Sequence, residues 1–362
     1  STQAKTLFPY TTLFRSTIGD DTLFGMEGND TLSGDSGGDL LNGGSGADSM
    51  TGGNGNDTYV VDSVKDSVVE SSATGGIDQV RSSIDYILGN NLENLTLVDT
   101  ANSKGVGNKL VNIIVGNDGD NVLNGKAGID SLNGGKGSDI YVFDSAADHP
   151  DAEVSDTGNT GTDEIRFAAS AAGTLNLFAG DAGIERVVIG TGTDTNAVTT
   201  GTTALNVNAT AVLNALSILG NAGINILWGT ALGDAIDAGA GDDKLIGGGG
   251  NDTLNGGAGN DIYVMNAAAD HQAAEISDSG GTADEIRFAS ATAGETLKLF
   301  AGEAGIEKVT IGTGTAAAVV STAVTALNVD ASLASYGLVI IGNAGNNQLM
   351  GTAFIDNISG GA

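Results

Sequence analysis

A single large apolar residue recurs every nine residues in four blocks of this chain, and small or polar residues fill most positions between. In the first block these residues are Leu23, Leu32, Leu41, Met50 and Tyr59, and each follows an aspartate by two positions. The register is G-G-x-G-x-D-x-U-x, where U is the apolar residue. Its glycine-rich part suits a turn, because glycine adopts positive φ and has no Cβ to block an inward carbonyl. The x-U-x part predicts a three-residue strand with U in the interior.

The register divides the chain into blocks and spacers. Nonapeptide blocks are expected over residues 17–60, 116–142, 220–264 and 342–362, with spacers over 61–115, 143–219 and 265–341. The spacers contain short β-branched or Leu-rich segments bounded by Gly, Asn or Asp, which predict further strands. Helical candidates are few, and the best are residues 146–153 and 210–216. We therefore predict an all-β fold, a parallel β-roll or β-solenoid built from nonapeptide repeats with β-rich spacer coils.

A longer repeat is superimposed on the short one. The run LFAGDAGIERVVIGTGT (177–193) returns as LFAGEAGIEKVTIGTGT (299–315), an offset of 122 residues. Residues 134–255 and 256–362 are thus interpreted as a tandem duplication, with the second copy truncated.

The nonapeptide predicts metal chemistry. Two nonapeptides make one coil, so the turns alternate between two edges, and stacked strands lie about 4.8 Å apart. This stacking brings the aspartate of one repeat close to that of the repeat after next. Two carboxylates plus turn carbonyls make an all-oxygen cage, which suits Ca²⁺ better than Mg²⁺, because Mg²⁺ prefers a tighter octahedron and keeps its waters.

The pairing rule can be applied residue by residue. It gives Asp21/Asp39, Asp30/Asp48, Asp39/Asp57, Asp234/Asp252 and Asp243/Asp261, plus the mixed pairs Asn121/Asp139 and Asn225/Asp243. The first and third blocks should therefore carry the main sites. Because Asp243 has two potential partners, its neutralisation is expected to harm calcium binding more than that of Asp234.

The run GGSGADSMTGGNGNDTYVVD (43–62) resembles the RTX (repeats-in-toxin) family, calcium-binding β-roll segments of proteins exported by bacterial type I secretion. The resemblance covers the four blocks, and the spacers more weakly. It implies the sixth-position aspartates as side-chain ligands, namely Asp21, Asp30, Asp39, Asp48, Asp57, Asp130, Asp139, Asp234, Asp243, Asp252 and Asp261. It implies the first, second and fourth glycines as backbone ligands, namely Gly43, Gly44, Gly46, Gly52, Gly53, Gly55, Gly134, Gly135, Gly137, Gly247, Gly248, Gly250, Gly256, Gly257 and Gly259.

Some turns depart from this pattern. Asn121, Asn225 and Asn347 replace the aspartate, and glycines are lost in GTALGDAID (229–237) and GTAFIDNIS (351–359). These coils are expected to bind calcium weakly or to serve as lead-in turns.

Composition supports a cation as the main partner. There are 45 Asp plus Glu against 14 Lys plus Arg, which gives a net charge of −31. This charge disfavours nucleic acid and anionic membranes and, without counter-ions, opposes compaction. The chain has no cysteine, which excludes disulfides and thiolate metal sites. No apolar run reaches the roughly 18 residues of a membrane span.

No catalytic constellation is found. The string GDSGG (34–38) falls in the nonapeptide register, no histidine precedes it, and no H-E-x-x-H occurs. The duplicated His149 and His271 are interpreted as turn or surface features, and Trp228 as packing at a strand end. Additional acids could be extra ligands or merely solvated, namely Asp62, Asp66, Asp144, Asp163 and Asp284.

The two ends of the sequence indicate that it is part of a longer protein with a non-native segment at its start. Residues 6–16, TLFPYTTLFRS, resemble the translation of a sequencing adapter, so residues 1–16 are set aside as a non-native artefact of environmental DNA assembly. The far end stops partway through a repeat, which predicts an internal fragment with a secretion signal beyond Ala362.

The expected function is calcium-driven folding of a secreted, extracellular RTX region that forms a structural or adhesive part of a larger bacterial protein. Its expected partners are calcium ions and cell-surface or matrix molecules. The alternative is the non-catalytic tail of a secreted protease, lipase or epimerase, and a disordered matrix protein comes third.

Overall fold

The computed structural model describes residues 13–16, 18–71, 75–158, 160–191, 197–278, 280–303, 305–312 and 321–361. They form short parallel strands and two single-turn 3-10 helices, η1 (Ala146–Asp148) and η2 (Ala268–Asp270). The chain divides into unit 1, Ser1–Ile165 with Gly180–Ile184, and unit 2, Arg166–Ala179 with Glu185–Ala362. The prediction of an all-β parallel solenoid is confirmed. None of the helices in the described residues is long and apolar enough to cross a bilayer.

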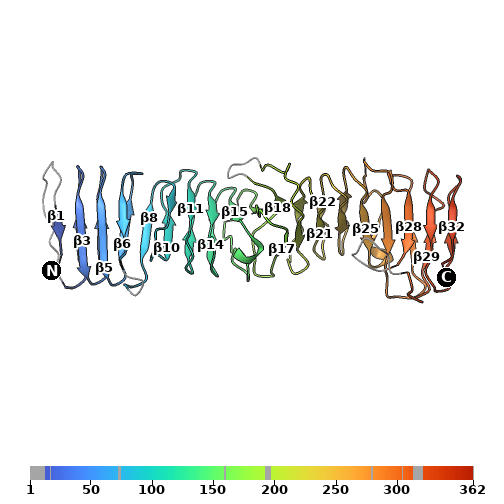
Figure 1. Ribbon diagram of the computed structural model, residues 1–362, viewed down its shortest axis with the longest axis horizontal. Helices are drawn as coiled ribbons and strands as arrows, with labels where there is room; N and C mark the ends of the chain where they lie inside the picture. The colour runs from blue at the N-terminus through green and yellow to red at the C-terminus, as the bar shows by residue number, and fades with distance from the viewer. Residues whose placement is uncertain are drawn as a thin grey trace. The chain divides into compact units, whose positions relative to one another are not determined.

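Unit 1 is a stack of parallel strands that follow one another along the chain (Figure 1). One sheet has the order β1-β3-β5-β7, with bounds Leu13–Arg15, Thr31–Ser36, Ser49–Asn54 and Ser67–Val69. A second sheet runs through β2 (Thr22–Phe24), β4 (Leu40–Asn42), β6 (Thr58–Val61), β8 (Gln79–Ser82), β10 (Asn94–Leu97), β12 (Ile113–Val115) and β14 (Ser131–Asn133). A third set pairs in turn, β9 (Tyr86–Ile87), β11 (Lys104–Val106), β13 (Val122–Asn124) and β15 (Ile140–Phe143).

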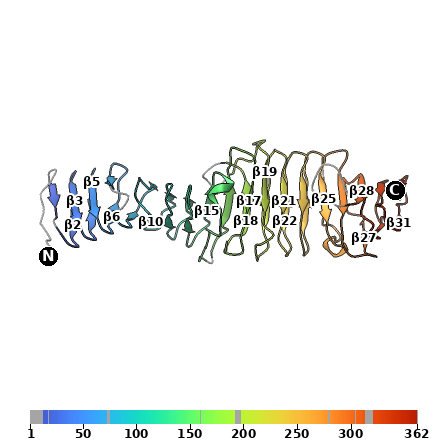
Figure 2. The same ribbon diagram turned by 60° about the horizontal axis from the view of Figure 1, so that its bottom comes forward.

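Unit 2 repeats this construction, and Figure 2 shows its strands stacked from β17 to β31. One sheet contains β17 (Gly173–Asn176), β19 (Leu205–Asn208), β21 (Ile226–Trp228), β23 (Lys244–Ile246), β25 (Ile262–Met265), β26 (Glu285–Phe288), β28 (Lys308–Ile311), β30 (Val339–Ile341) and β32 (Asn357–Ser359). A second set of strands pairs in turn, β18 (Arg186–Ile189), β20 (Ser217–Leu219), β22 (Ala235–Asp237) and β24 (Thr253–Asn255). A separate three-stranded sheet contains β27 (Thr296–Lys298), β29 (Asn328–Asp330) and β31 (Leu349–Met350). The remaining strand, β16, is Glu164–Phe167.

The register confirms that two nonapeptides make one coil. Leu41 lies opposite Tyr59 between β4 and β6, and Leu32 lies opposite Met50 between β3 and β5. Within a nonapeptide block, neighbouring strands of one sheet therefore carry residues 18 positions apart, and consecutive repeats belong to different sheets. These four U residues are fully buried, so each nonapeptide contributes one side chain to the core.

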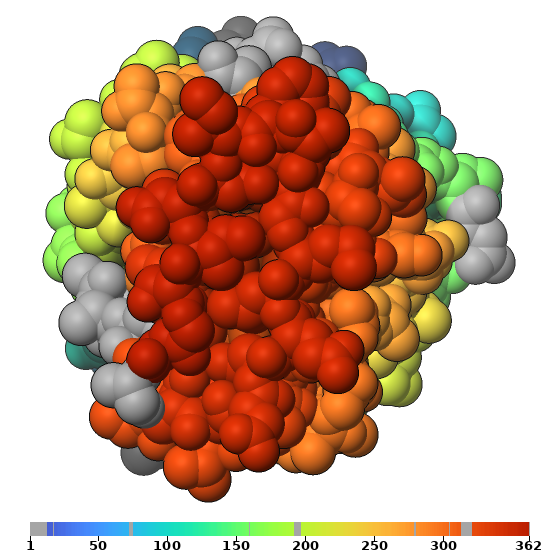
Figure 3. Space-filling view, turned by 90° about the vertical axis from the view of Figure 1, so that its right-hand side faces the viewer, coloured from blue at the N-terminus to red at the C-terminus, as the bar shows by residue number. Residues whose placement is uncertain are grey.

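The strands differ in how many of their residues they bury. All four residues of β26 are buried, whereas β24 buries only Leu254. The last strand of its sheet, β32, has all three residues exposed, and Figure 3 shows the last coils of unit 2, in red, facing the viewer. The helical expectation reduces to η1 within residues 146–153, while the described residues 210–216 form turns and bends.

The segment set aside as non-native lies partly outside the described residues, which begin at Leu13. Leu13–Arg15 form β1 and pair with Thr31–Ser33 of β3. The pairing is physically undemanding, because an edge strand is held by backbone hydrogen bonds that any non-proline sequence supplies.

Candidate metal centres

The sixth-position aspartates form hydrogen-bonded ladders along the turns. The backbone N–H of Asp30 donates to Oδ1 of Asp48, and that of Asp39 to Oδ1 of Asp57, both at 2.7 Å. The same bond joins Asp21 to Asp39, Asn121 to Asp139, Asn225 to Asp243, Asp234 to Asp252 and Asp243 to Asp261. Each acid therefore lies beside its counterpart two repeats away, on one of two alternating edges.

The second oxygen of these carboxylates is buried without a hydrogen-bond partner. This holds for Oδ2 of Asp39, Asp48, Asp57, Asp130, Asp139, Asp243, Asp252 and Asp261. None of these residues is more than 5 % exposed. A buried carboxylate oxygen without a partner is costly, because it has lost its water and gained nothing in return. The turns are thus built to place oxygen atoms around a ligand that supplies positive charge.

The first glycine of each turn makes room for this arrangement. A Cβ at Gly34 would lie 2.2 Å from Oδ2 of Asp39 and 2.8 Å from the carbonyl oxygen of Gly52. A Cβ at Gly247 would lie 2.1 Å from Oδ2 of Asp252. Any side chain here would fill the space that a carboxylate and the carbonyl of the next coil border. This donor set, hard oxygens on several sides of a small space, fits Ca²⁺.

The second and fourth glycines are required for another reason, which is backbone conformation. Positive φ values occur at Gly44, Gly46, Gly53, Gly55, Gly135, Gly137, Gly248, Gly250, Gly257 and Gly259. The first-position glycines Gly43, Gly52, Gly134, Gly247 and Gly256 have no such φ. One nonapeptide therefore uses glycine both for left-handed turns and for close approach.

Replacing a first-position glycine should remove one calcium site. In Gly247→Ala the new methyl group would occupy the place of Oδ2 of Asp252, so we expect calorimetric calcium titration to show one site fewer. Gly302→Ala is the matched control, because a Cβ there meets nothing within 4 Å. Equal calcium binding by the two variants would contradict this account of the glycine.

Burial raises the pKa of the ladder aspartates. The pKa reaches about 7 for Asp139, Asp243 and Asp261 and about 6 for Asp39, Asp130 and Asp252. Desolvation is the largest cause, and neighbouring carboxylates add to it, as Asp156 and Asp163 do at Asp139. A bound cation would favour the ionised form of these groups and lower their pKa again.

In the turns where asparagine replaces the aspartate, the asparagine side chain forms hydrogen bonds within the protein. Asn225 donates from Nδ2 to the carbonyl of Leu205 at 2.6 Å and accepts from the N–H of Asn221 at 3.0 Å. Asn121 and Asn347 make the same bond with Asn117 and Asn343. These uncharged, bonded side chains support the expectation that such coils are lead-in turns.

In the turns that lack the second- and fourth-position glycines, a threonine forms hydrogen bonds with the aspartate. The N–H of Thr230 donates to Oδ2 of Asp234 at 2.6 Å, and that of Thr352 donates to Oδ2 of Asp356 at 2.7 Å. Oδ1 of Asp234 accepts from the N–H of Leu216 at 2.6 Å. Both oxygens of Asp234 are therefore already bonded, unlike Oδ2 of Asp243.

This difference sharpens the comparison of Asp243 with Asp234. We expect Asp243→Ala to lower calcium affinity, measured by calorimetric titration, more than Asp234→Ala does, because only Asp243 presents a free buried oxygen. Asp237→Ala removes an exposed charge from the same block and should bind like the parent chain. Equal losses at Asp243 and Asp234 would contradict the alternating-edge geometry.

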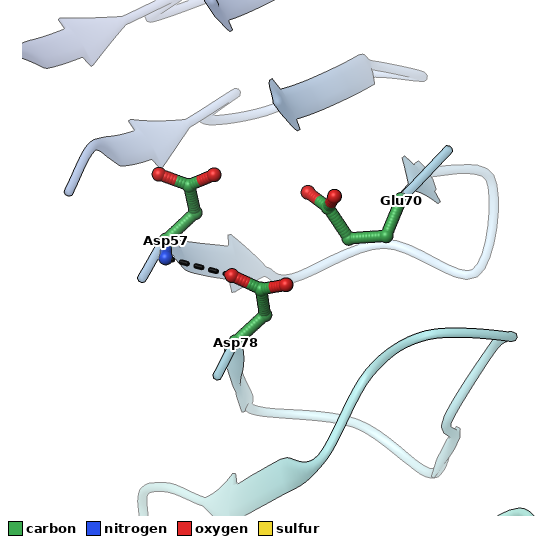
Figure 4. Close-up of side chains that lie close together, drawn as sticks. All are labelled: Asp57, Glu70 and Asp78. Atoms are coloured by element: carbon green, nitrogen blue, oxygen red, sulfur yellow. Dashed lines mark hydrogen bonds between the residues drawn. The ribbon is translucent and has the colours of Figure 1, made fainter. Parts of the chain in front are cut away.

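Three groups of buried carboxylates lie where nonapeptide blocks give way to spacers. They are Asp57, Glu70 and Asp78 (Figure 4), then Asp139, Asp156 and Asp163, then Asp261, Asp278 and Asp284. Within each group the ligand atoms all lie within 4.8 Å of one another. Sequence reasoning named the first member of each group, left Asp163 and Asp284 open, and missed Glu70, Asp78, Asp156 and Asp278. The available signal was the tyrosine at the U position of each last repeat.

The other candidate acids separate into different roles. Asp66 extends a ladder, because its Oδ1 accepts from the N–H of Asp48 at 3.1 Å. Asp144 pairs with Lys126 at 2.6 Å, and Asp62 is exposed. Trp228 lies at the end of β21, as expected.

The histidines follow the single-turn helices η1 and η2, as the turn interpretation expects, but their interpretation as surface features is wrong. His149 and His271 are 2 % and 5 % exposed. Nε2 of His149 lies 3.0 Å from Oδ2 of Asp181, and Nε2 of His271 lies 3.0 Å from Oε1 of Glu303. Burial lowers the pKa of His271, but the carboxylates of Glu275 and Glu303 outweigh it and raise this pKa to about 9. The His271 imidazolium is thus a cation fixed inside its spacer, and Asp181 and Glu153 likewise raise the pKa of His149 against the effect of its burial.

The fold and its turns define a calcium-binding β-roll. A family model described as the RTX calcium-binding nonapeptide repeat (4 copies) matches residues 15–50, 24–59, 33–67, 115–149, 228–263 and 341–362. These matches overlap all four predicted blocks. The segments are RTX repeats, and Ca²⁺ is the ion that such repeats bind. No curated protein matches the chain.

Proposed function

We propose that this chain is a secreted, extracellular RTX region whose folding is driven by calcium. The observation that supports this proposal best is the row of buried carboxylate oxygens in the ladders that have no hydrogen-bond partner. Bound calcium supplies the positive charge that these oxygens lack. The chain supplies their placement, through the N–H bond that fixes Oδ1 of each acid and the glycine that leaves Oδ2 uncovered.

The energetics favour coupling of folding to binding. Each nonapeptide buries one apolar residue, too little to offset the ordering of a turn with several glycines. The net charge of −31 adds repulsion that grows as the chain compacts. A ligand that binds only the folded state stabilises that state by mass action, so binding and folding become one event.

The coupling of folding to calcium binding supports an extracellular location for the folded chain. Extracellular calcium modules bind with dissociation constants of about 10⁻⁴–10⁻³ M. A chain of this affinity stays unfolded where calcium is scarce and folds outside the cell. The 122-residue repeat supports a structural or adhesive role in a larger surface protein, because repetition extends a solenoid without adding a new kind of site.

Limited proteolysis tests the proposed function. In EGTA the whole chain should be cut rapidly at many positions, whereas in millimolar calcium the strands should be protected and cleavage confined to exposed turns. Fragment masses identify the sites. An identical digestion pattern with and without calcium would contradict calcium-driven folding.

A further inference from the structure

We propose that the three carboxylate groups at the block ends are composite calcium sites, each of which locks a spacer to the nonapeptide block before it. This inference rests on the proposed function and adds to it a class of ligand outside the nonapeptide. Each site combines one nonapeptide aspartate with two carboxylates from the spacer, and its ligand is a hard cation, Ca²⁺ or a trivalent lanthanide.

The same geometry arises from different lengths of chain. Glu70 follows Asp57 by 13 residues, whereas Asp156 and Asp278 follow Asp139 and Asp261 by 17. The shorter connection carries the longer glutamate side chain. Connections of two different lengths thus bring the ligand atoms of each group within 4.8 Å of one another, an arrangement that unligated carboxylates resist.

A tyrosine positions the second carboxylate in each group. The hydroxyl of Tyr141 accepts from the N–H of Gly134 at 2.7 Å and donates to Oδ2 of Asp156 at 2.6 Å. The hydroxyl of Tyr263 does the same between Gly256, at 2.8 Å, and Asp278, at 2.7 Å. Tyr59 bridges Gly52 and Glu70 in the first group. Leu or Met at the U position could not hold a carboxylate there.

The third carboxylate continues the ladder into the spacer. The N–H of Asp57 donates to Oδ1 of Asp78 at 2.8 Å, as Figure 4 shows. Equivalent bonds join Asp139 to Asp163 at 2.8 Å and Asp261 to Asp284 at 2.7 Å. Each of these acids immediately precedes the spacer strand that pairs next in the ladder, β8, β16 or β26. The site therefore fixes the register of that strand.

Buried oxygens without hydrogen-bond partners point to a ligand in each group. They are Oδ2 of Asp57, Oε2 of Glu70, Oδ2 of Asp139, Oδ2 of Asp261 and Oδ2 of Asp284. Their residues are between 0 % and 7 % exposed. Because calcium affinity rises with the number of charged ligands, three carboxylates should bind more tightly than the nonapeptide cages and should fill first.

Terbium luminescence in the whole chain tests this inference, because Tb³⁺ replaces Ca²⁺ and is sensitised by a nearby tyrosine. In a Trp228→Phe background, the first three equivalents of Tb³⁺ per chain should give tyrosine-sensitised emission that calcium displaces. Asp278→Asn should remove about one third of this emission and weaken calcium binding at that site about tenfold. Tyr263→Phe should remove the same third. Tyr86→Phe and Asp237→Asn are the matched controls and should leave it unchanged.

Hydrogen exchange supplies a second readout in saturating calcium. In Asp278→Asn the amides of β26 should exchange faster while those of β22 stay protected, which shows that the block still folds. Unsensitised early Tb³⁺ binding, or an Asp278→Asn variant that titrates like its parent, would overturn the composite sites. The proposed function would survive that result, since it fails only if calcium leaves the folding of the whole chain unchanged.

Discussion

In EGTA at pH 7.5 the chain is expected to lose its β circular-dichroism spectrum. Its radius of gyration should approach the roughly 70 Å of an unfolded chain of this length. Without calcium, the buried carboxylates of each ladder repel one another. A core of one apolar residue per nonapeptide is too small to offset this repulsion. Millimolar CaCl₂ should restore the β spectrum and reduce the radius measured by small-angle X-ray scattering.

Magnesium is the control for this experiment. MgCl₂ at the same concentration should not restore the spectrum, because Mg²⁺ prefers a tighter octahedron and retains its waters. The mechanism fails if a β spectrum is already present in EGTA and calcium leaves it unchanged.

Acidification is expected to restore part of the β structure in calcium-free buffer. Burial raises the pKa of Asp78, Asp139 and Asp243 in the folded chain to about 7, against about 3.9 in an unfolded chain. A raised acid pKa destabilises the folded state above that value, and the penalty disappears as the pH falls toward the unfolded pKa. The stability of the calcium-free chain should therefore increase from pH 8 to pH 5.

Calcium should reverse this dependence, because protons then compete with the metal for the same carboxylates. His271 adds to the calcium-free trend, because its pKa is about 9 in the folded chain and about 6.5 in an unfolded one, so its stabilisation is complete below pH 6.5 and decreases as the pH rises toward 9. Circular dichroism at pH 8, 6.5 and 5, in calcium-stripped buffer and in CaCl₂, measures both slopes. A calcium-free β signal that falls on acidification would show that the carboxylates are not what prevents folding.

The repeat arithmetic predicted the solenoid because a fixed period of nine residues leaves one solution for stacking. Leu32 opposite Met50 and Asp39 beside Asp57 follow directly from a coil of two repeats. Glycine spacing likewise predicted the positive φ at Gly44 and Gly46. Wherever the nine-residue period is maintained, the position of a residue in its repeat is enough to predict which residue it contacts in the next coil.

Contacts outside the period could not be predicted in this way. Asp156 reaches Asp139 across a spacer whose loop length no period specifies, and His149 meets Asp181, 32 residues away. An Asp-His pair followed by proline looks like a surface turn until its carboxylate partners are known. These groups lie where the chain leaves the nonapeptide register.

The ladder bonds all run in one direction. In every rung the N–H belongs to the earlier repeat and the carboxylate to the later one, as from Asp243 to Asp261. Losing the C-terminal rung of a block therefore strands a buried N–H, whereas losing the N-terminal rung only frees an oxygen that water can solvate. Truncation of a block from its C-terminal side should therefore destabilise the remaining coils more than truncation from its N-terminal side.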